Sequence, residues 1–119
     1  MRLKAFGITL LILACTISCS TSPKLGKDIQ PNSLKDGIFE GTYKHGPNEA
    51  DVRVTIENQR LVKVEIIRHD AWKGKKANDI IPGRIVEKQS TRVEAVSGAT
   101  NSSYVIMNAV QNALDKAVQ

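Results

Sequence analysis

Two segments of alternating apolar and polar residues place the tightest limit on how this chain can fold. They read ADVRVTIE, residues 50–57, and LVKVEIIRH, residues 61–69. Successive side chains of a strand point to opposite faces, so each segment predicts a strand with one buried face. The connection between them, ENQR, is short enough for a hairpin, and Asn58 can adopt a positive φ there. The apolar residues expected on the shared buried face are Val52, Val54, Ile56, Val62, Val64 and Ile66.

A further strand is predicted before this hairpin. The segment DGIFEGTYK, residues 36–44, contains Phe39 and Tyr43 on either side of Gly41, and HGPNEA, residues 45–50, has the composition of a turn. The three strands would form an antiparallel meander, whose apolar face needs a cover.

Two helices are expected to supply that cover. Pro82 suits the first position of a short helix with the sequence PGRIVEKQS, residues 82–90. TRVEAV, residues 91–96, is a candidate short fourth strand, and a second helix runs from about Ser102 to Ala117. The predicted fold class is therefore α+β, a small antiparallel sheet covered by a short helix and a C-terminal helix. The apolar positions of the last helix lie three and four residues apart, as on one helical face: Ile106, Ala109, Val110, Ala113, Leu114 and Ala117.

The N-terminal residues have the organisation of a secretory signal peptide. Arg2 and Lys4 form a basic start, and the run from Ala5 to Ala14 is uncharged and mostly apolar. That run is shorter than the roughly 20 residues that a membrane-spanning helix needs. The segment therefore predicts export rather than a membrane span.

Both cysteines of the chain, Cys15 and Cys19, lie near the end of this apolar run, which excludes a disulfide framework and a cysteine metal site from the folded domain. ILAC and TISC, which end at these cysteines, both resemble the lipobox of bacterial lipoproteins. Cys19 leaves the fuller apolar run and is the predicted lipidation site; an ordinary cleaved signal is the alternative. We predict a signal peptide at 1–18, a lipidated cysteine and flexible tether at 19–34, and a domain at 35–119. The mature protein would then be lipid-anchored to the outer face of a bacterial membrane.

The net charge offers little support for a nucleic-acid partner. The chain has 17 Lys and Arg residues against 12 Asp and Glu residues. Removal of Arg2 and Lys4 with the signal leaves 15 basic residues against the same 12 acidic ones, a net charge of +3. This mild excess, together with export, argues against nucleic acid.

The segment EAVSGATNSS, residues 94–103, places small and hydroxyl-bearing residues just before the last helix. Gly98 frees the backbone to turn, and Ala99 adds little bulk. The first amides of a helix are unpaired and the helix dipole is positive there, so the segment suits a phosphate group. On local chemistry alone, a simple helix N-cap is the favoured interpretation and a phosphate site is the alternative. Neither a P-loop nor a dinucleotide-binding glycine motif is present.

The same segment resembles the motif of the FMN-binding domain family, Asp-x-x-Ser/Thr-Gly-Ala-Thr. That family includes the flavin-bearing periplasmic subunits of the sodium-translocating NADH:quinone reductase and of Rnf-type complexes. DGIFEGTY, VTIENQRLVKVEI and AVQNALDKA resemble other segments of the family, so the resemblance covers nearly the whole domain. In family members the motif threonine carries FMN through a phosphoester bond, which a dedicated FMN transferase installs from FAD.

The resemblance implies a set of site residues in this chain. Thr100 would be the attachment residue for FMN, and the residues before it would form the turn around the phosphate. Glu94 stands where the family has aspartate; it would serve recognition by the transferase, and noncovalent FMN is the alternative if the longer acid prevents attachment. The implied cofactor-binding residues are Ser97, Gly98, Ala99, Thr100, Ser102 and Ser103.

Other candidate residues carry less weight. His45 lies in the predicted turn and His69 at a strand end; without metal-ligand spacing, both are expected in solvent rather than on a metal. The polar loop before the first helix is expected to be exposed, with one half-buried Trp; stacking on or flanking a flavin ring is the alternative. Its candidate residues are Trp72, Lys73, Lys75 and Lys76.

The leading functional hypothesis is a lipoprotein that carries one FMN for electron transfer at the membrane surface, with no catalytic residues of its own. Its implied partners are the FMN transferase, a redox donor in the membrane and an extracytoplasmic acceptor. A nonenzymatic lipoprotein docking module without covalent flavin is the alternative. A reductase with its own substrate is less favoured, because family relatives with such activity usually fuse this domain to a catalytic one.

Overall fold

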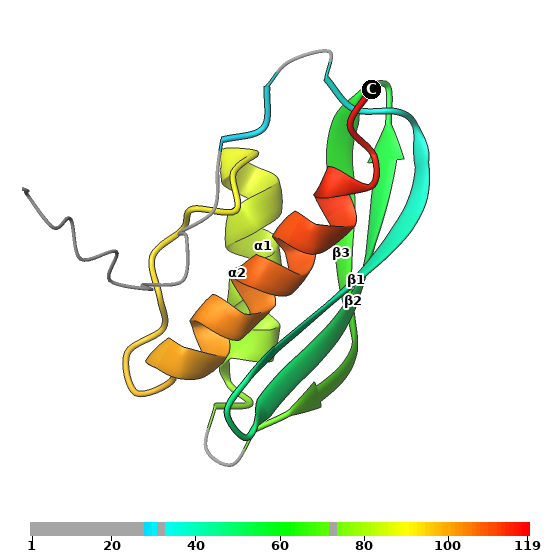
Figure 1. Cartoon of the computed structure of the whole chain (residues 1–119). Helices are drawn as coiled ribbons and strands as arrows, with labels where there is room; N and C mark the ends of the chain where they lie inside the picture. The colour runs from blue at the N-terminus through cyan, green and yellow to red at the C-terminus, as the bar shows by residue number, and fades with distance from the viewer. Residues whose placement is uncertain (1–27, 31–32, 72–73) are drawn as a thin grey trace, which may run out of the picture.

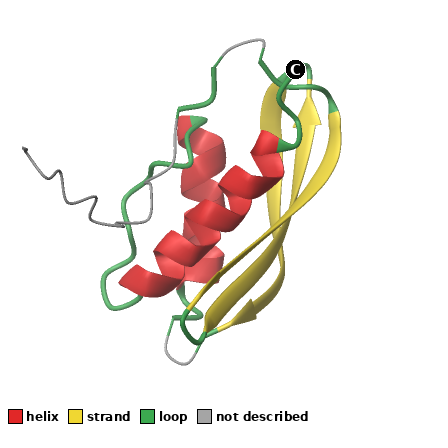
Figure 2. Cartoon of the chain, viewed as in Figure 1, coloured by secondary structure: helices red, strands yellow, loops and turns green. Residues whose placement is uncertain are grey.

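The computed structural model of the chain describes residues 28–30, 33–71 and 74–119. The predicted signal peptide, both cysteines and most of the predicted tether lie outside these residues. Three strands are followed by two helices, both on the same face of the sheet (Figure 1, Figure 2). The sheet is antiparallel with the order β1-β2-β3, which confirms the predicted α+β meander. The elements are β1 (Gly37–His45), β2 (Asn48–Glu57), β3 (Arg60–Asp70), α1 (Ala77–Lys88) and α2 (Thr100–Asp115).

The turn between β2 and β3 is a two-residue hairpin loop. Asn58 has φ 52° and Gln59 has φ 61°, the pair of positive values that a type I′ turn requires. The expectation of a positive φ at Asn58 is therefore confirmed. The Asp36 carboxylate accepts hydrogen bonds from both turn amides, at 2.9 Å from Asn58 and 2.7 Å from Gln59. The residue just before β1 thus stabilises the turn between β2 and β3.

A β-bulge corrects the predicted buried face of β3. Ile56 pairs with Leu61 and Thr55 pairs with Lys63, so Val62 has no partner opposite it. An extra residue in one strand shifts the alternation of side chains by one position. Leu61 is therefore buried, whereas Val62, expected in the core, is 40% exposed.

A second bulge, near the other end of β3, moves His69 to the inner face. Val52 pairs with Ile66 and Asp51 with Arg68, so Ile67 is the extra residue. Beyond it His69 pairs with Ala50, which is fully buried. His69 is only 8% exposed, and its expected place in solvent is therefore wrong.

The first helix begins five residues earlier than Pro82, where the sequence placed its start. Ala77, Ile81 and Ile85 recur every four residues and are all fully buried. Pro82 has no amide hydrogen, so the carbonyl of Asn78 in the first turn loses one helical hydrogen bond. Burial of the apolar face of α1 offsets this single loss.

The candidate fourth strand is not formed. Residues 91–96, all of them described, adopt no strand conformation, and Ser90 before them makes only an isolated bridge to Asp28. Val93 and Val96 are nevertheless buried. The apolar residues of this segment therefore enter the core without pairing to the sheet.

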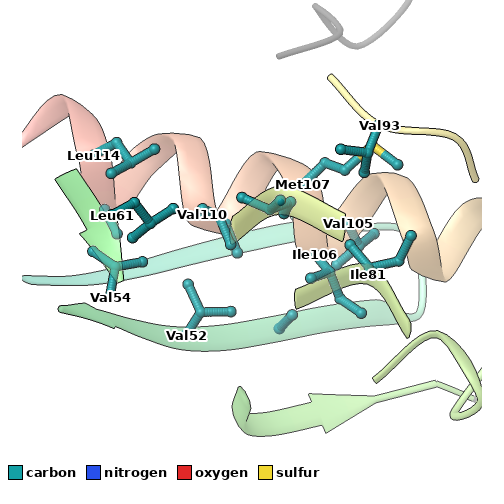
Figure 3. Close-up of a cluster of buried hydrophobic side chains, with 14 of the residues drawn as sticks. Val52, Val54, Leu61, Ile81, Val93, Val105, Ile106, Met107, Val110 and Leu114 are labelled. Atoms are coloured by element: carbon teal, nitrogen blue, oxygen red, sulfur yellow. The ribbon is translucent and has the colours of Figure 1, made fainter. Parts of the chain in front are cut away.

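Helix α2 covers β1 and β2, α1 packs on β3, and the two helices contact each other. α2 begins two residues before the predicted Ser102, and every apolar position expected on its inner face is buried. Figure 3 shows how these side chains meet those of the strands and of α1. At Gly41, a Cβ atom would lie 2.2 Å from the Ala109 carbonyl oxygen, so the backbones of β1 and α2 are in direct contact.

The folded domain also includes the residue just before its predicted start. Leu34, assigned to the tether from the sequence, is 3% exposed and forms a bridge with Val118. The Lys35 amide donates to the Ala117 carbonyl at 2.8 Å. Neither described helix has the length and apolar character to cross a membrane.

Candidate functional site

A tight turn precedes α2 and sets the geometry of the predicted site. The Ala99 amide donates to the Val96 carbonyl at 2.9 Å, which closes a four-residue turn. Gly98, the third residue, has φ +78°, the value that a type II turn requires there and that side chains disfavour. Ser97 and Gly98 are exposed at the tip of this turn.

Ser103 holds the turn from inside the protein. Its hydroxyl accepts a hydrogen bond from the Val96 amide at 3.0 Å and donates one to the Ala99 carbonyl at 2.7 Å. The residue is fully buried. Ser103 therefore supports the turn, and its expected contact with the cofactor stays a prediction.

The N-terminus of α2 carries no cap. Its N-cap residue is Ala99, no side chain makes a cap hydrogen bond, and the first turn holds no acidic residue. The first amides of a helix have no partner within it, and the helix end carries a partial positive charge. The exposed Thr100 side chain stands at this end.

A hollow of about 430 Å³ opens beside these residues. Its volume lies within the range of small-molecule sites, about 300–1,000 Å³. In Figure 1 the β1–β2 turn, the loop before α1 and the start of α2 lie at the same end of the molecule. The lining residues are Pro47, Asn48, Gly74, Gly98, Ala99, Thr100, Asn101 and Ser102.

The lining includes residues predicted for the site from the sequence and others that were not predicted. Four predicted site residues line the hollow: Gly98, Ala99, Thr100 and Ser102. The opposite wall, formed by Pro47, Asn48 and Gly74, was missed because those residues are distant in sequence and match no motif. Their turn-forming composition was visible, but only the fold brings them to α2.

Gly74 joins the loop before α1 to the first turn of α2. A Cβ atom built on Gly74 would lie 1.7 Å from the Ser102 hydroxyl oxygen and 2.3 Å from its Cβ. Both residues are buried. Only a glycine therefore allows this loop to approach the helix so closely.

Lys76, at the end of the same loop, reaches the turn before α2. A Cβ atom on Gly98 would lie 2.9 Å from the Lys76 Nζ and 3.5 Å from its Cε. Lys76 is also the N-cap residue of α1. Trp72 and Lys73 lie outside the described residues, and Lys75 and Lys76 are both exposed.

Glu94 lies at the start of the motif segment, with its side chain exposed. Its backbone carbonyl accepts a hydrogen bond from Arg84 Nη1 at 2.7 Å. Arg84 extends from α1, so this bond fixes the start of the segment to that helix. The carboxylate at the family's aspartate position stays accessible from outside.

The two histidines differ in their surroundings. His45 is exposed, whereas the Nδ1 atom of buried His69 makes a short hydrogen bond with Asn78 Oδ1. The Nε2 atom of His69 has no hydrogen-bond partner among the described residues. Within the same residues no three His, Cys, Asp or Glu side chains gather where they could hold a metal ion.

Comparison with known proteins agrees with this geometry. Residues 45–115 match the model of the FMN-binding domain. An uncharacterised protein of Treponema pallidum (strain Nichols) is 31% identical over 102 residues, which span 81% of this chain and 27% of that protein. The chain thus corresponds to about a quarter of that relative. Since the family model covers more than half of the chain, including both walls of the hollow, the chain belongs to the FMN-binding domain family, and its cofactor is FMN.

Proposed function

We propose that this protein carries FMN covalently, through a phosphoester bond to Thr100. The observation that carries the proposal is the exposed Thr100 side chain, at the uncapped start of α2 and on the wall of a hollow of about 430 Å³. A buried hydroxyl, or one without space beside it, would be incompatible with an attached nucleotide.

The residues present fit the cofactor in shape. Gly98 and Gly74 line the hollow without side chains of their own, and Ala99 adds only a methyl group at the base of the turn. Pro47 and Asn48, one apolar and one polar residue, contribute to the opposite wall, a combination that suits a flat heterocycle with polar edges.

The residues also fit the cofactor in charge. The free amides and positive dipole of a helix N-terminus favour a phosphate group. Residues 100–103 at the start of α2 include no acidic side chain that would repel it. The phosphate would therefore lie at Thr100 and the flavin ring in the hollow.

Attachment would be a phosphoryl transfer without redox change. The Thr100 hydroxyl oxygen would form a bond to the phosphorus next to riboflavin in FAD. The pyrophosphate bond of FAD would break, AMP would leave with the bridging oxygen, and the hydroxyl proton would pass to a base of the FMN transferase or to solvent. The accessible Glu94 carboxylate supports recognition of the motif by that enzyme.

The attached flavin would serve electron transfer at a membrane surface. FMN can exchange one or two electrons, and the protein supplies the binding site and its electrostatic surroundings. Export and a lipid anchor at Cys19, with a tether to the domain, would let the flavin move between a membrane donor and an extracytoplasmic acceptor. We propose no substrate chemistry for the protein's own side chains.

The test is the intact mass of the protein after co-expression with an FMN transferase. Wild type should gain one FMN, Thr100→Ala should gain none, and both should have similar circular dichroism. Thr55→Ala is the control, because Thr55 lies on β2 with its side chain away from the core. FMN mass on Thr100→Ala would refute the attachment site. If wild type gained no flavin although the co-expressed transferase modified another acceptor protein, the docking-module hypothesis would be favoured.

A further inference from the structure

Lys76 is a cation placed against the positive end of α2. Its Nζ atom lies 2.9 Å from where a Gly98 Cβ would stand, in the turn that leads into the helix. The helix end behind that turn has neither a side-chain cap nor an acidic residue in its first turn. Lys76 is exposed, and its ammonium group and the positive helix end lie on either side of the same turn, an arrangement that favours an anion between them.

No carboxylate compensates this charge among the described residues. The ion pairs on the sheet, such as Arg53–Glu40 and Lys63–Glu65, join carboxylates to other cations. Lys76 belongs to none of them. Its ammonium group has only hydrogen-bond donors and so cannot cap the amides at the start of α1.

The loop that carries Lys76 is held close to the site. Gly74 packs directly on Ser102, and the Ala77 amide donates to the Gly74 carbonyl at 3.0 Å. This short turn fixes the backbone around Lys76 against the first turn of α2. The side chain can then span the distance from the start of one helix to the start of the other.

We infer that Lys76 binds the phosphate group that is esterified to Thr100. The inference rests on the proposed function and deepens it. A phosphodiester keeps one negative charge, and an ammonium group beside the helix N-terminus would neutralise that charge from the side opposite the helix. Lys76 is thus a positioning residue: it would hold the phosphate against the turn, so that the flavin ring points into the hollow.

The test compares Lys76→Gln with two matched variants. Lys75→Gln removes the neighbouring exposed lysine, and Lys76→Arg keeps the charge. Each protein is loaded to completion with purified transferase and FAD, and the rise in melting temperature on loading is measured together with the ³¹P NMR resonance of the diester. We expect a smaller rise and a shifted resonance for Lys76→Gln, wild-type values for Lys75→Gln, and a restored rise for Lys76→Arg.

The rate of attachment gives a second readout. An exposed charge pair contributes modestly, so Lys76→Gln should slow attachment about two- to five-fold at low salt. The difference should shrink between about 0.01 M and about 1 M salt, because the Debye length falls from about 30 Å to about 3 Å. Lys75→Gln should show neither effect.

The outcomes separate this inference from the proposed function. If the loaded Lys76→Gln protein matches the loaded wild type in melting-temperature rise and ³¹P resonance, the contact is refuted while attachment to Thr100 stands. Attachment could instead become slower while the melting-temperature rise and ³¹P resonance of the loaded protein stay unchanged. That result would indicate that Lys76 contacts the transferase rather than the bound phosphate, and it would also refute the contact. A wild type that never takes FMN would refute both.

Discussion

The two ends of α2 differ in how their polar groups are used. Near the C-terminal end, Asn112 Nδ2 donates to the Thr42 carbonyl at 2.8 Å, and Lys116 Nζ donates to the Glu40 carbonyl at 2.6 Å. At the other end Thr100 has an exposed side chain, and no side chain caps the helix. One end is fastened to β1, whereas the other leaves its hydrogen-bonding capacity open beside the hollow.

The difference indicates which end of α2 contributes mainly to stability and which is available for binding. The fastened end contributes hydrogen bonds and buried apolar area to the fold. The open end forgoes a helix cap, which is typically worth about 1 kcal/mol. Its amides are thereby left for a phosphate. Substitutions at the two ends should therefore affect different measurements.

The largest effect is expected for Gly41→Ala, at the fastened end. The new Cβ would lie 2.2 Å from the Ala109 carbonyl oxygen and 2.4 Å from the Ala113 amide nitrogen. Both are backbone atoms, so α2 must move away from β1. We expect the free energy of unfolding, measured in urea, to fall by about 3 kcal/mol.

The control for that substitution is Gly83→Ala, in α1. A Cβ there meets nothing within 4 Å. Replacing an exposed helical glycine with alanine should raise the free energy of unfolding by about 0.5–1 kcal/mol. A Gly41→Ala protein as stable as wild type would show that α2 does not depend on its close contact with β1.

A smaller effect is expected for Gly74→Ala, at the open end, and a second substitution should partly restore the lost stability. Here the clash is with the Ser102 side chain, 1.7 Å from its oxygen and 2.3 Å from its Cβ. We expect a loss of about 2 kcal/mol in the free energy of unfolding. Adding Ser102→Gly removes both clashing atoms and leaves only the Ser102 Cα, 3.7 Å away.

The double variant should therefore be more stable than the sum of the two single changes implies. A double-mutant cycle in urea measures this coupling, which we expect to be favourable by about 1 kcal/mol. Additive losses would contradict the close packing of the loop on α2. Flavin attachment should fall in Gly74→Ala and recover in part in the double variant, because the same loop lines the hollow.

The sequence predicted the regular parts of the fold because their signals are local. Alternation identified the hairpin of β2 and β3, and the spacing of Ile106, Val110 and Leu114 identified the inner face of α2. At both bulges an apolar pair, Leu61-Val62 and Ile66-Ile67, interrupts the alternation, but the pair alone does not show which of its residues faces the core. Only the structure therefore shows on which face of the sheet the side chains after each bulge lie.

The candidate site was predictable on one wall only. Gly98 and Thr100 belong to a contiguous motif, and the turn and helix start that they form follow from local chemistry. Pro47 and Gly74 approach them only after the sheet and α1 have packed. The direction of the Ser103 hydroxyl, toward the Val96 amide, likewise depends on the path of the turn and not on residue type.

The smallest effect tests whether the open end of α2 is left bare for binding. Asn101 is exposed in the first turn and lines the hollow. Asn101→Asp places a negative charge at the positive helix end, so the flavin-free protein should gain about 0.3–1 kcal/mol in urea unfolding. The same charge would repel the incoming phosphate, so attachment of FMN should become slower, as followed by intact mass. Asn112→Asp, at the fastened end, is the control and should lose stability with its hydrogen bond to Thr42 while attaching FMN normally. If Asn101→Asp attached FMN at the wild-type rate at low salt, the bare end would have no electrostatic role in binding, and the contrast between the two ends of α2 would reduce to packing alone.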